Sequence, residues 1–248
     1  MQRPVLETPT AKISLFAARL AIGASISALV LLLSLHVLSP EFSPAWRMIS
    51  EYANGRYGWV LSLMFAAYGL STLAAAVAVG PWLRTRRGRV GLVMLTISGI
   101  GQVAAAAFDL NQEVPHELAG VLGIVCLPIA AMLIDVPPGG RPEWVAGGKS
   151  LRLLANLTWM SVVLWVASFV LMIVTFMTAA GGLPTTPPES LPPGVIALVG
   201  WTNRLVVVSA WAWVGSIAWH TLTLRRRLGA AASGRPSDRA PAVAAAAR

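Results

Sequence analysis

Long runs of uncharged, apolar residues constrain this chain more than any other feature of its sequence. Residues 57–83 and 158–180 contain no charged residue, and four further runs approach the same length. A helix that crosses a bilayer needs about 20 mostly apolar residues. The chain is therefore predicted to be all-α, a polytopic membrane protein built as a bundle of six transmembrane helices. The spans are expected at residues 13–38, 58–82, 90–109, 117–135, 158–180 and 195–224.

The composition supports a membrane protein and excludes several other classes. Of the 248 residues, 56% are hydrophobic and 12% are charged, whereas an ordinary soluble domain has about 25% charged residues. A single Cys excludes a disulfide-rich secreted domain. The net charge of +9 first suggests a nucleic-acid partner. No nucleic-acid-binding module is recognisable in the sequence, however, so no nucleic acid is predicted as a partner.

Basic residues gather on one side of the predicted membrane. Six spans place both termini on the same side, and 16 of the 19 Lys and Arg residues fall there. The positive-inside rule makes this side cytoplasmic, which predicts a protein of the cell inner (plasma) membrane with both termini in the cytoplasm. The cytoplasmic side then carries a charge of +12 and the outer side −3. Membrane lipids are the expected partners, with anionic headgroups at the inner basic loops.

The spans divide the sequence into three regions. Residues 1–12 are predicted to be a short cytoplasmic segment, and residues 13–224 the membrane domain. Residues 225–248 are basic and, from residue 229 on, rich in Ala, Pro, Ser and Arg with no apolar period, so we expect a disordered cytoplasmic tail.

Polar side chains from several segments meet at the predicted outer side. The segment 39–56, the turn 108–117 and the beginning of the last span bring such residues to one depth. We interpret them as a ligand-binding or charge cluster. Its predicted members are Glu51, Arg56, Asp109, His116, Glu117, Asn203 and Arg204.

Arg204 is the most informative member of this cluster. If the last helix begins near residue 195, Arg204 lies about 13 Å below its start, at about 1.5 Å per residue. A charge at this depth usually faces the bundle interior and is paired, and Glu51, Asp109 and Glu117 are the available acids. Alternatively, residues 205–224 span the membrane alone and Arg204 lies at the outer interface.

The turn residues also have a plainer interpretation. Asp109, His116 and Glu117 can be solvated helix ends, and the negative charge of Glu117 suits a helix N-terminus. No metal site is predicted, because the sequence has no HExxH motif, no paired Cys and no His pair at helical spacing. His36, His116 and Asp109 are the weak candidates for metal ligands, and no cofactor is predicted.

Three functions are compatible with the outer cluster. The first is non-enzymatic binding of a lipid or a small ligand, which is favoured because no catalytic motif is recognisable. The second is an outer-leaflet lipid hydrolase, with or without a metal, that would use His36, His116 and Asp109. The third is a proton- or ion-coupled transporter with Asp109, Glu117 and Arg204 as a charge relay.

Three stretches carry a family resemblance. They read LSPEFSPAWRMISEYANGRYGWVLSLMFAAYGL from residue 38, FDLN…PHELAG from residue 108 and GWTNRL from residue 200. Together they resemble the uncharacterised prokaryotic membrane family catalogued as domain of unknown function 998, over roughly residues 15–225. The resemblance implies a six-span bundle and a candidate site at residues 49–59, Asp109, His116 and Arg204, but no activity. More distantly, the layout is similar to the Frag1/DRAM/Sfk1 group of six-span eukaryotic proteins linked to lipid organisation and autophagy.

Overall fold

Helices account for the regular structure of the computed structural model, which describes residues 9–134, 148–182 and 188–232. No strand occurs within these ranges. Two short 3-10 helices, η2 (Ile49–Asn54) and η3 (Gly80–Trp82), follow the first two long helices. The long helices are α1 (Pro9–Leu38), α2 (Gly58–Val79), α3 (Arg86–Ala107), α4 (Glu113–Leu133), α6 (Gly148–Ala180) and α7 (Val199–Ala232).

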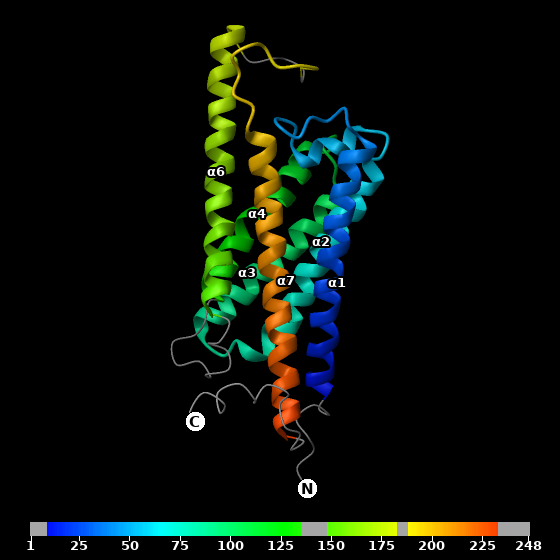
Figure 1. Cartoon of the computed structure of the whole chain (residues 1–248), viewed down its shortest axis with the longest axis vertical. Coiled ribbons are helices and arrows are strands. Elements are labelled where there is room, and N and C mark those ends of the chain that lie inside the picture. Colours follow the sequence, from blue (N-terminus) through cyan, green and yellow to red (C-terminus); the bar gives the residue numbers. More distant parts are fainter. Residues whose placement is uncertain (1–8, 135–147, 183–187, 233–248) are drawn as a thin grey trace, which may run out of the picture.

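These six helices of the described ranges are long and apolar enough to cross a membrane, in one case with η3 extending α2. The predicted all-α, six-span membrane protein is thereby confirmed. The helices run side by side, and α1 begins at the same end of the bundle at which α7 ends (Figure 1). Helix α7 contacts α1, α2, α4 and α6, and its apolar stretch is the most buried of the six, whereas that of α6 is the least buried.

Five helices extend beyond the predicted spans, and two of them, α1 and α3, begin early at Pro9 and Arg86. Helix α4 begins at Glu113, α6 begins at Gly148 and α7 continues to Ala232. The predictions followed uncharged residues, but a helix can continue where its charged side chains reach water, and the helix dipole favours an acid in the first turn. The first eight residues of the predicted tail, 225–232, are therefore helical. Residues 1–8 and 233–248 lie outside the described residues.

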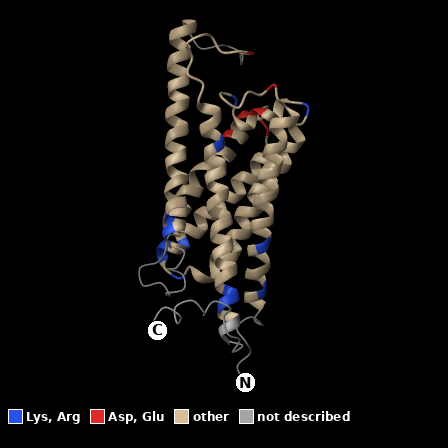
Figure 2. Ribbon diagram, viewed as in Figure 1, with Lys and Arg blue, Asp and Glu red and all other residues tan. Residues whose placement is uncertain are grey.

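Charge distinguishes the two ends of the bundle (Figure 2). All described Asp and Glu residues lie at the end where α1 ends and α7 begins, which we call the acidic end. Most described Lys and Arg residues lie at the opposite, basic end. The described exceptions at the acidic end are Arg47, Arg56 and Arg204. The acidic end corresponds to the side that the sequence predicts to be outer.

Buried polar side chains connect the helices inside the bundle. Thr72 of α2 donates to Oε1 of Gln102 at 2.6 Å, and Nε2 of Gln102 donates to Oγ of Ser98 at 3.0 Å. Ser98 in turn donates to the carbonyl oxygen of Gly123 at 2.8 Å. This chain of hydrogen bonds joins α2, α3 and α4 in the interior of the bundle.

Close approach of α3 and α4 requires glycine at position 101. A Cβ at Gly101 would lie 2.7 Å from the backbone nitrogen of Gly123 and 2.8 Å from the carbonyl oxygen of Ala119. We expect Gly101→Ala to lower the free energy of unfolding by about 1–3 kcal/mol, because backbone atoms must move apart. Gly120→Ala is the control, since a Cβ there has no neighbour within 4 Å. Equal thermal stabilities of the two variants in detergent would contradict this packing argument.

Candidate functional site

The chain between α1 and α2, residues 39–57, folds over the acidic end of the bundle. Helix α1 ends at Leu38, two residues before Pro40, which has no N–H to continue a helix. The segment then forms η2, whose Ile49 and Tyr52 side chains are 2% and 0% exposed. These two apolar anchors place the polar backbone of the segment beside the first turns of α7.

Two hydrogen bonds from backbone nitrogens attach this segment to α7. The backbone nitrogen of Gly200 donates to the carbonyl oxygen of Ala45 at 3.0 Å. The backbone nitrogen of Ile49 donates to Oδ1 of Asn203 at 3.0 Å, and the Asn203 side chain is buried. Asn203, a predicted cluster member, thus acts as a contact between α7 and the 39–57 segment.

Arg204 is buried beneath the same segment, with 6% of its surface exposed. Its Nε donates to Nε2 of His36 at 2.7 Å, and its Nη2 donates to the hydroxyl of Tyr52 at 3.1 Å. Its Nη1 donates to the carbonyl oxygens of Arg47 at 2.8 Å and Gly200 at 3.0 Å, with that of Pro44 at 3.4 Å. Arg204 is buried, as the sequence predicts, but α7 begins at Val199 rather than near residue 195. Arg204 therefore lies five residues into the helix, and the expected depth of about 13 Å is wrong.

The partners of Arg204 differ from the predicted ones. Within the described residues, no carboxylate forms an ion pair with it, so pairing with Glu51, Asp109 or Glu117 is wrong. Neutral groups accept its hydrogen bonds instead: carbonyl oxygens, a phenol hydroxyl and an imidazole nitrogen. A guanidinium group has five N–H donors, and the described acceptors leave one N–H of Nη2 without a partner.

The hydrogen bonds of His36 fix its protonation state. Its Nδ1 lies 2.7 Å from the carbonyl oxygen of Leu32, which can only accept, so Nδ1 carries the proton. Its Nε2 accepts from Arg204, which can only donate. The ring is therefore neutral, and both of its nitrogens are used within the protein.

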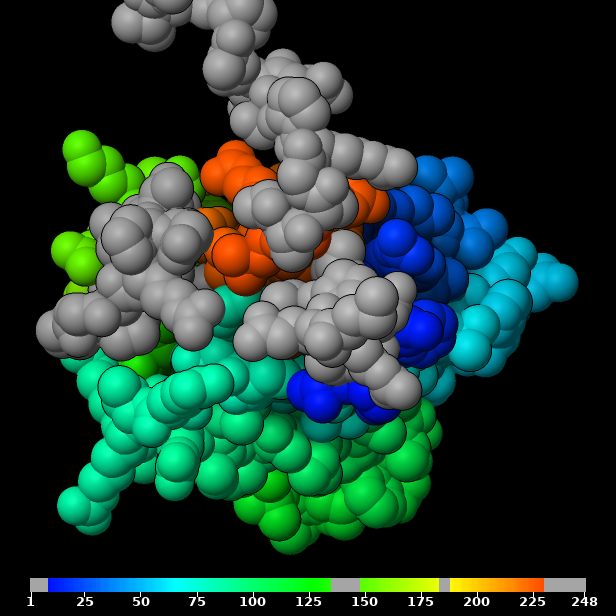
Figure 3. Space-filling model, turned by 90° about the horizontal axis from the view of Figure 1, so that it is seen from below, coloured from blue at the N-terminus to red at the C-terminus, as the bar shows by residue number. Residues whose placement is uncertain are grey.

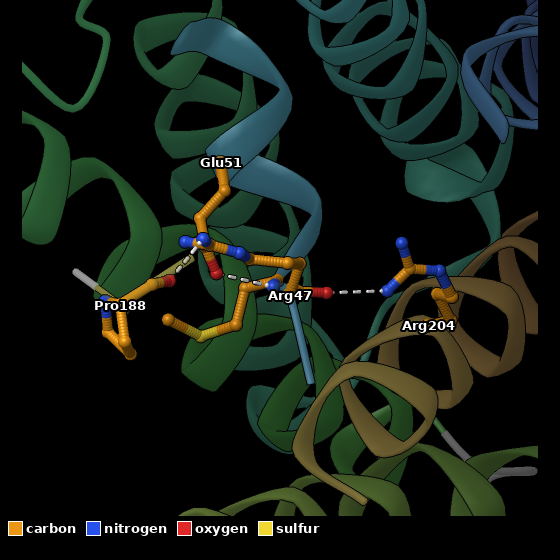
Figure 4. Close-up of polar contacts among 5 residues, drawn as sticks. Arg47, Glu51, Pro188 and Arg204 are labelled. Carbon is orange, nitrogen blue, oxygen red and sulfur yellow. Dashed lines mark hydrogen bonds and ion pairs between the residues drawn. The ribbon is translucent and has the colours of Figure 1, made fainter. Parts of the chain in front are cut away.

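Arg47 links the 39–57 segment to the chain before α7 (Figure 4). Its Nη1 donates to Oε2 of Glu51 at 2.7 Å, and its Nη2 donates to the carbonyl oxygen of Pro188 at 2.7 Å. The other oxygen of Glu51 accepts from the backbone nitrogen of Met48 at 2.7 Å. Glu51 therefore stabilises the first turn of η2 and reaches Arg204 only indirectly, through the Arg47 backbone.

The remaining predicted site residues are separate from this network. Oδ1 of Asp109 accepts from the backbone nitrogen of Asn111 at 2.9 Å, and Nδ1 of His116 lies 2.8 Å from the carbonyl oxygen of Phe108. Glu117 and Arg56 are exposed. Among the described residues, no hydrogen bond or ion pair joins any of these four side chains to Arg204. Asp109 and His116 instead shape the α3–α4 turn.

The weak metal candidates are not brought together. Within the ranges that the structure describes, no group of three or more His, Cys, Asp or Glu side chains is placed to hold a metal ion. Both nitrogens of His36 already have protein partners. The proposed charge relay likewise lacks a link in the described chain, because Asp109 and Glu117 form no ion pair with Arg204.

Sequence reasoning missed the residues that actually surround Arg204. Tyr52, Pro44 and Arg47 were not predicted as its partners, and two of these three contribute backbone carbonyls. A carbonyl acceptor leaves no mark on the residue type, so no side-chain pattern could have indicated it. Only Tyr52 could have been suggested from the sequence, because a tyrosine in a polar segment beside a membrane can bury its ring and direct its hydroxyl to a partner.

Comparison with known proteins identifies one family. The chain matches the family described as "Protein of unknown function (DUF998)" over residues 21–220, which includes His36, the 39–57 segment and Arg204. No curated protein and no solved structure matches the chain. The match covers well over half of the 248 residues. This multi-pass membrane protein therefore belongs to the DUF998 family.

Proposed function

We propose that this protein binds an anionic ligand, a lipid headgroup or a small anion, at the acidic end through Arg204. The observation that supports the proposal is a buried guanidinium with no carboxylate partner among the described residues and one unused N–H. Burying a charge is costly unless it is paired and hydrogen-bonded. An anionic oxygen would supply both the missing acceptor and the missing countercharge.

A second unsatisfied group lies in the same part of the chain. Ser39 follows α1 by one residue and is 0% exposed, and its hydroxyl has no hydrogen-bond partner within the described part of the chain. Buried polar groups are nearly always hydrogen-bonded, so an exception calls for an explanation. A ligand with several oxygen atoms would offer an acceptor to Arg204 and a partner to Ser39.

The proposal can be tested by ligand-dependent stability in nanodiscs. We expect wild-type protein to unfold at a higher temperature in discs containing phosphatidylglycerol, or with glycerol phosphate added, than in phosphatidylcholine alone, because a ligand of the native state stabilises it. The gain should be clearly smaller in Arg204→Gln than in wild type and stay unchanged in Arg56→Gln, whose side chain is exposed at the same end. The two additions separate a lipid headgroup from a soluble anion.

A second variant keeps the test decisive if Arg204→Gln does not fold. Tyr52→Phe removes the acceptor of Arg204 Nη2 and keeps the Arg204 charge. The rise in unfolding temperature that the anion causes should therefore be larger in this variant than in wild type. A gain in Arg204→Gln equal to that of wild type, or in Tyr52→Phe no larger than that of wild type, would refute binding at Arg204.

We further propose that the protein lies in the inner (plasma) membrane with its acidic end outside and both termini in the cytoplasm. The excess of Lys and Arg at the basic end supports this orientation. In a Cys126→Ala background, a membrane-impermeant maleimide should label Asn54→Cys in intact cells, and Arg86→Cys only after permeabilisation. Both positions are exposed, at the acidic and basic ends respectively. The reverse labelling pattern would invert the orientation.

A further inference from the structure

A buried arginine at the basic end has no hydrogen-bond acceptor among the residues that the structure describes. Arg225 lies in the last turns of α7 and is 9% exposed. Its Nε is buried without a hydrogen-bond partner, and no hydrogen bond or ion pair joins its guanidinium group to any described residue. Arg204 has acceptors for four of its five N–H groups. In Arg225, only Nε is a buried atom without a described partner, so the two terminal nitrogens lie at the surface, where a ligand can reach them.

Trp82 positions this guanidinium group. The central carbon of the Arg225 guanidinium lies 4.7 Å from the centroid of the Trp82 ring. Trp82 ends η3, which continues α2, so the contact joins the ends of two helices. An arginine over an aromatic ring is attracted electrostatically. This contact does not occupy the N–H groups at the edge of the guanidinium, which can still donate hydrogen bonds. That edge matches the geometry of a phosphate group, to which it can donate two parallel bonds.

The surroundings of Arg225 favour an anion. Arg226 and Arg227 follow it on α7 and are exposed, and Arg84, Arg86, Arg87 and Arg89 follow Trp82. No acidic residue is described at this end. Seen from the basic end, the end of α7 lies between α1 and α6, with the beginning of α3 beside it (Figure 3). Clustered basic residues next to helix ends attract anionic headgroups.

We propose that Arg225, stacked on Trp82, is the centre of a binding site for a phosphate group at the basic end of the bundle. The phosphate belongs to a lipid headgroup or to a soluble phosphate compound. Its oxygens accept from the guanidinium edge, and the exposed arginines around it contribute long-range attraction. This site lies at the opposite end of α7 from Arg204 and is independent of the function proposed there.

The test compares Arg225→Met with Arg226→Met, a neighbour whose side chain is exposed. We expect phosphatidylglycerol in the nanodiscs, or inorganic phosphate in the buffer, to raise the unfolding temperature of wild type and of Arg226→Met. Arg225→Met should show a clearly smaller rise than wild type, because only the contribution of the Arg204 site remains. A rise with inorganic phosphate alone assigns the site to a soluble compound, and a rise with the lipid alone assigns it to a headgroup.

Affinity provides a second measurement. Arg225→Lys keeps the positive charge but cannot form the bidentate hydrogen bond. The lipid or phosphate that stabilises wild type should therefore bind this variant about tenfold or more weakly. The proposal is overturned if neither phosphate source stabilises wild type, or if Arg225→Met retains the full rise.

Discussion

Arg204→Met should lower the free energy of unfolding by about 3–6 kcal/mol, the largest loss that we expect from a single substitution in this protein. The change removes the donor that Nε2 of His36, the hydroxyl of Tyr52 and the carbonyl oxygen of Arg47 share. Each buried acceptor left without a partner costs about 1–3 kcal/mol. The loss exceeds that of an ordinary large-to-small substitution because it affects three elements at once.

Arg56→Met is the matched control for this substitution. Arg56 belongs to the same segment, but it is exposed, and its only described contact is a loose one with the Tyr57 ring, at 5.6 Å. Its replacement should leave stability unchanged within experimental error. The measurement is the unfolding of both variants by a denaturing detergent, monitored by tryptophan fluorescence. Similar midpoints for Arg204→Met and wild type would show that the network around Arg204 does not hold the 39–57 segment in place.

Arg204→Lys should give an intermediate result. The ammonium group keeps the charge and three donors, but it lacks the planar arrangement that reaches His36, Tyr52 and the Arg47 carbonyl together. Partial recovery of stability would therefore separate the contribution of charge from that of hydrogen-bond geometry.

The helices could be predicted from the sequence because the bilayer imposes a length on apolar runs. The run at 158–180 falls inside α6, and the run at 57–83 contains α2 and η3. Helix ends were less predictable. Helix α6, for example, begins at Gly148 and includes Lys149 and Arg152, which lie outside the uncharged run. Hydropathy measures where the hydrocarbon ends, and a helix does not have to end there.

The site was predictable only in part, and the reason is physical. The burial of Arg204 could be predicted from its place in an apolar run, where a charge usually faces the protein, although α7 begins later than assumed. The partners of Arg204 could not be predicted in the same way, because a buried cation in a protein does not have to pair with a carboxylate. The 39–57 segment instead directs backbone carbonyls at Nη1, with dipoles that no sequence pattern records. The hydrogen bonds of Asp109 and His116, to nearby backbone groups, agree with their plainer interpretation as helix-end residues.

Gly200 determines how closely the 39–57 segment approaches α7. A Cβ at this position would overlap the carbonyl oxygen of Pro44 and lie 2.8 Å from that of Arg47. Both atoms belong to the backbone, so no side-chain rotation can relieve the overlap. The same residue donates its N–H to Ala45 and its carbonyl accepts from Arg204. A side chain here would therefore displace several hydrogen bonds along with the segment.

We expect Gly200→Ala to lower the free energy of unfolding by about 2–4 kcal/mol, which combines overpacking with weakened bonds to Arg204. Gly215→Ala on the same helix is the control. A Cβ there meets nothing within 4 Å, so alanine should stabilise the helix by about 0.5–1 kcal/mol.

The displaced segment in Gly200→Ala should also become accessible to trypsin at Arg47, which wild type holds through Glu51 and Pro188. Faster cleavage at Arg47 in Gly200→Ala but not in Gly215→Ala would locate the damage in the segment. Equal cleavage and equal stability would mean that the 39–57 segment does not depend on its close contact with α7.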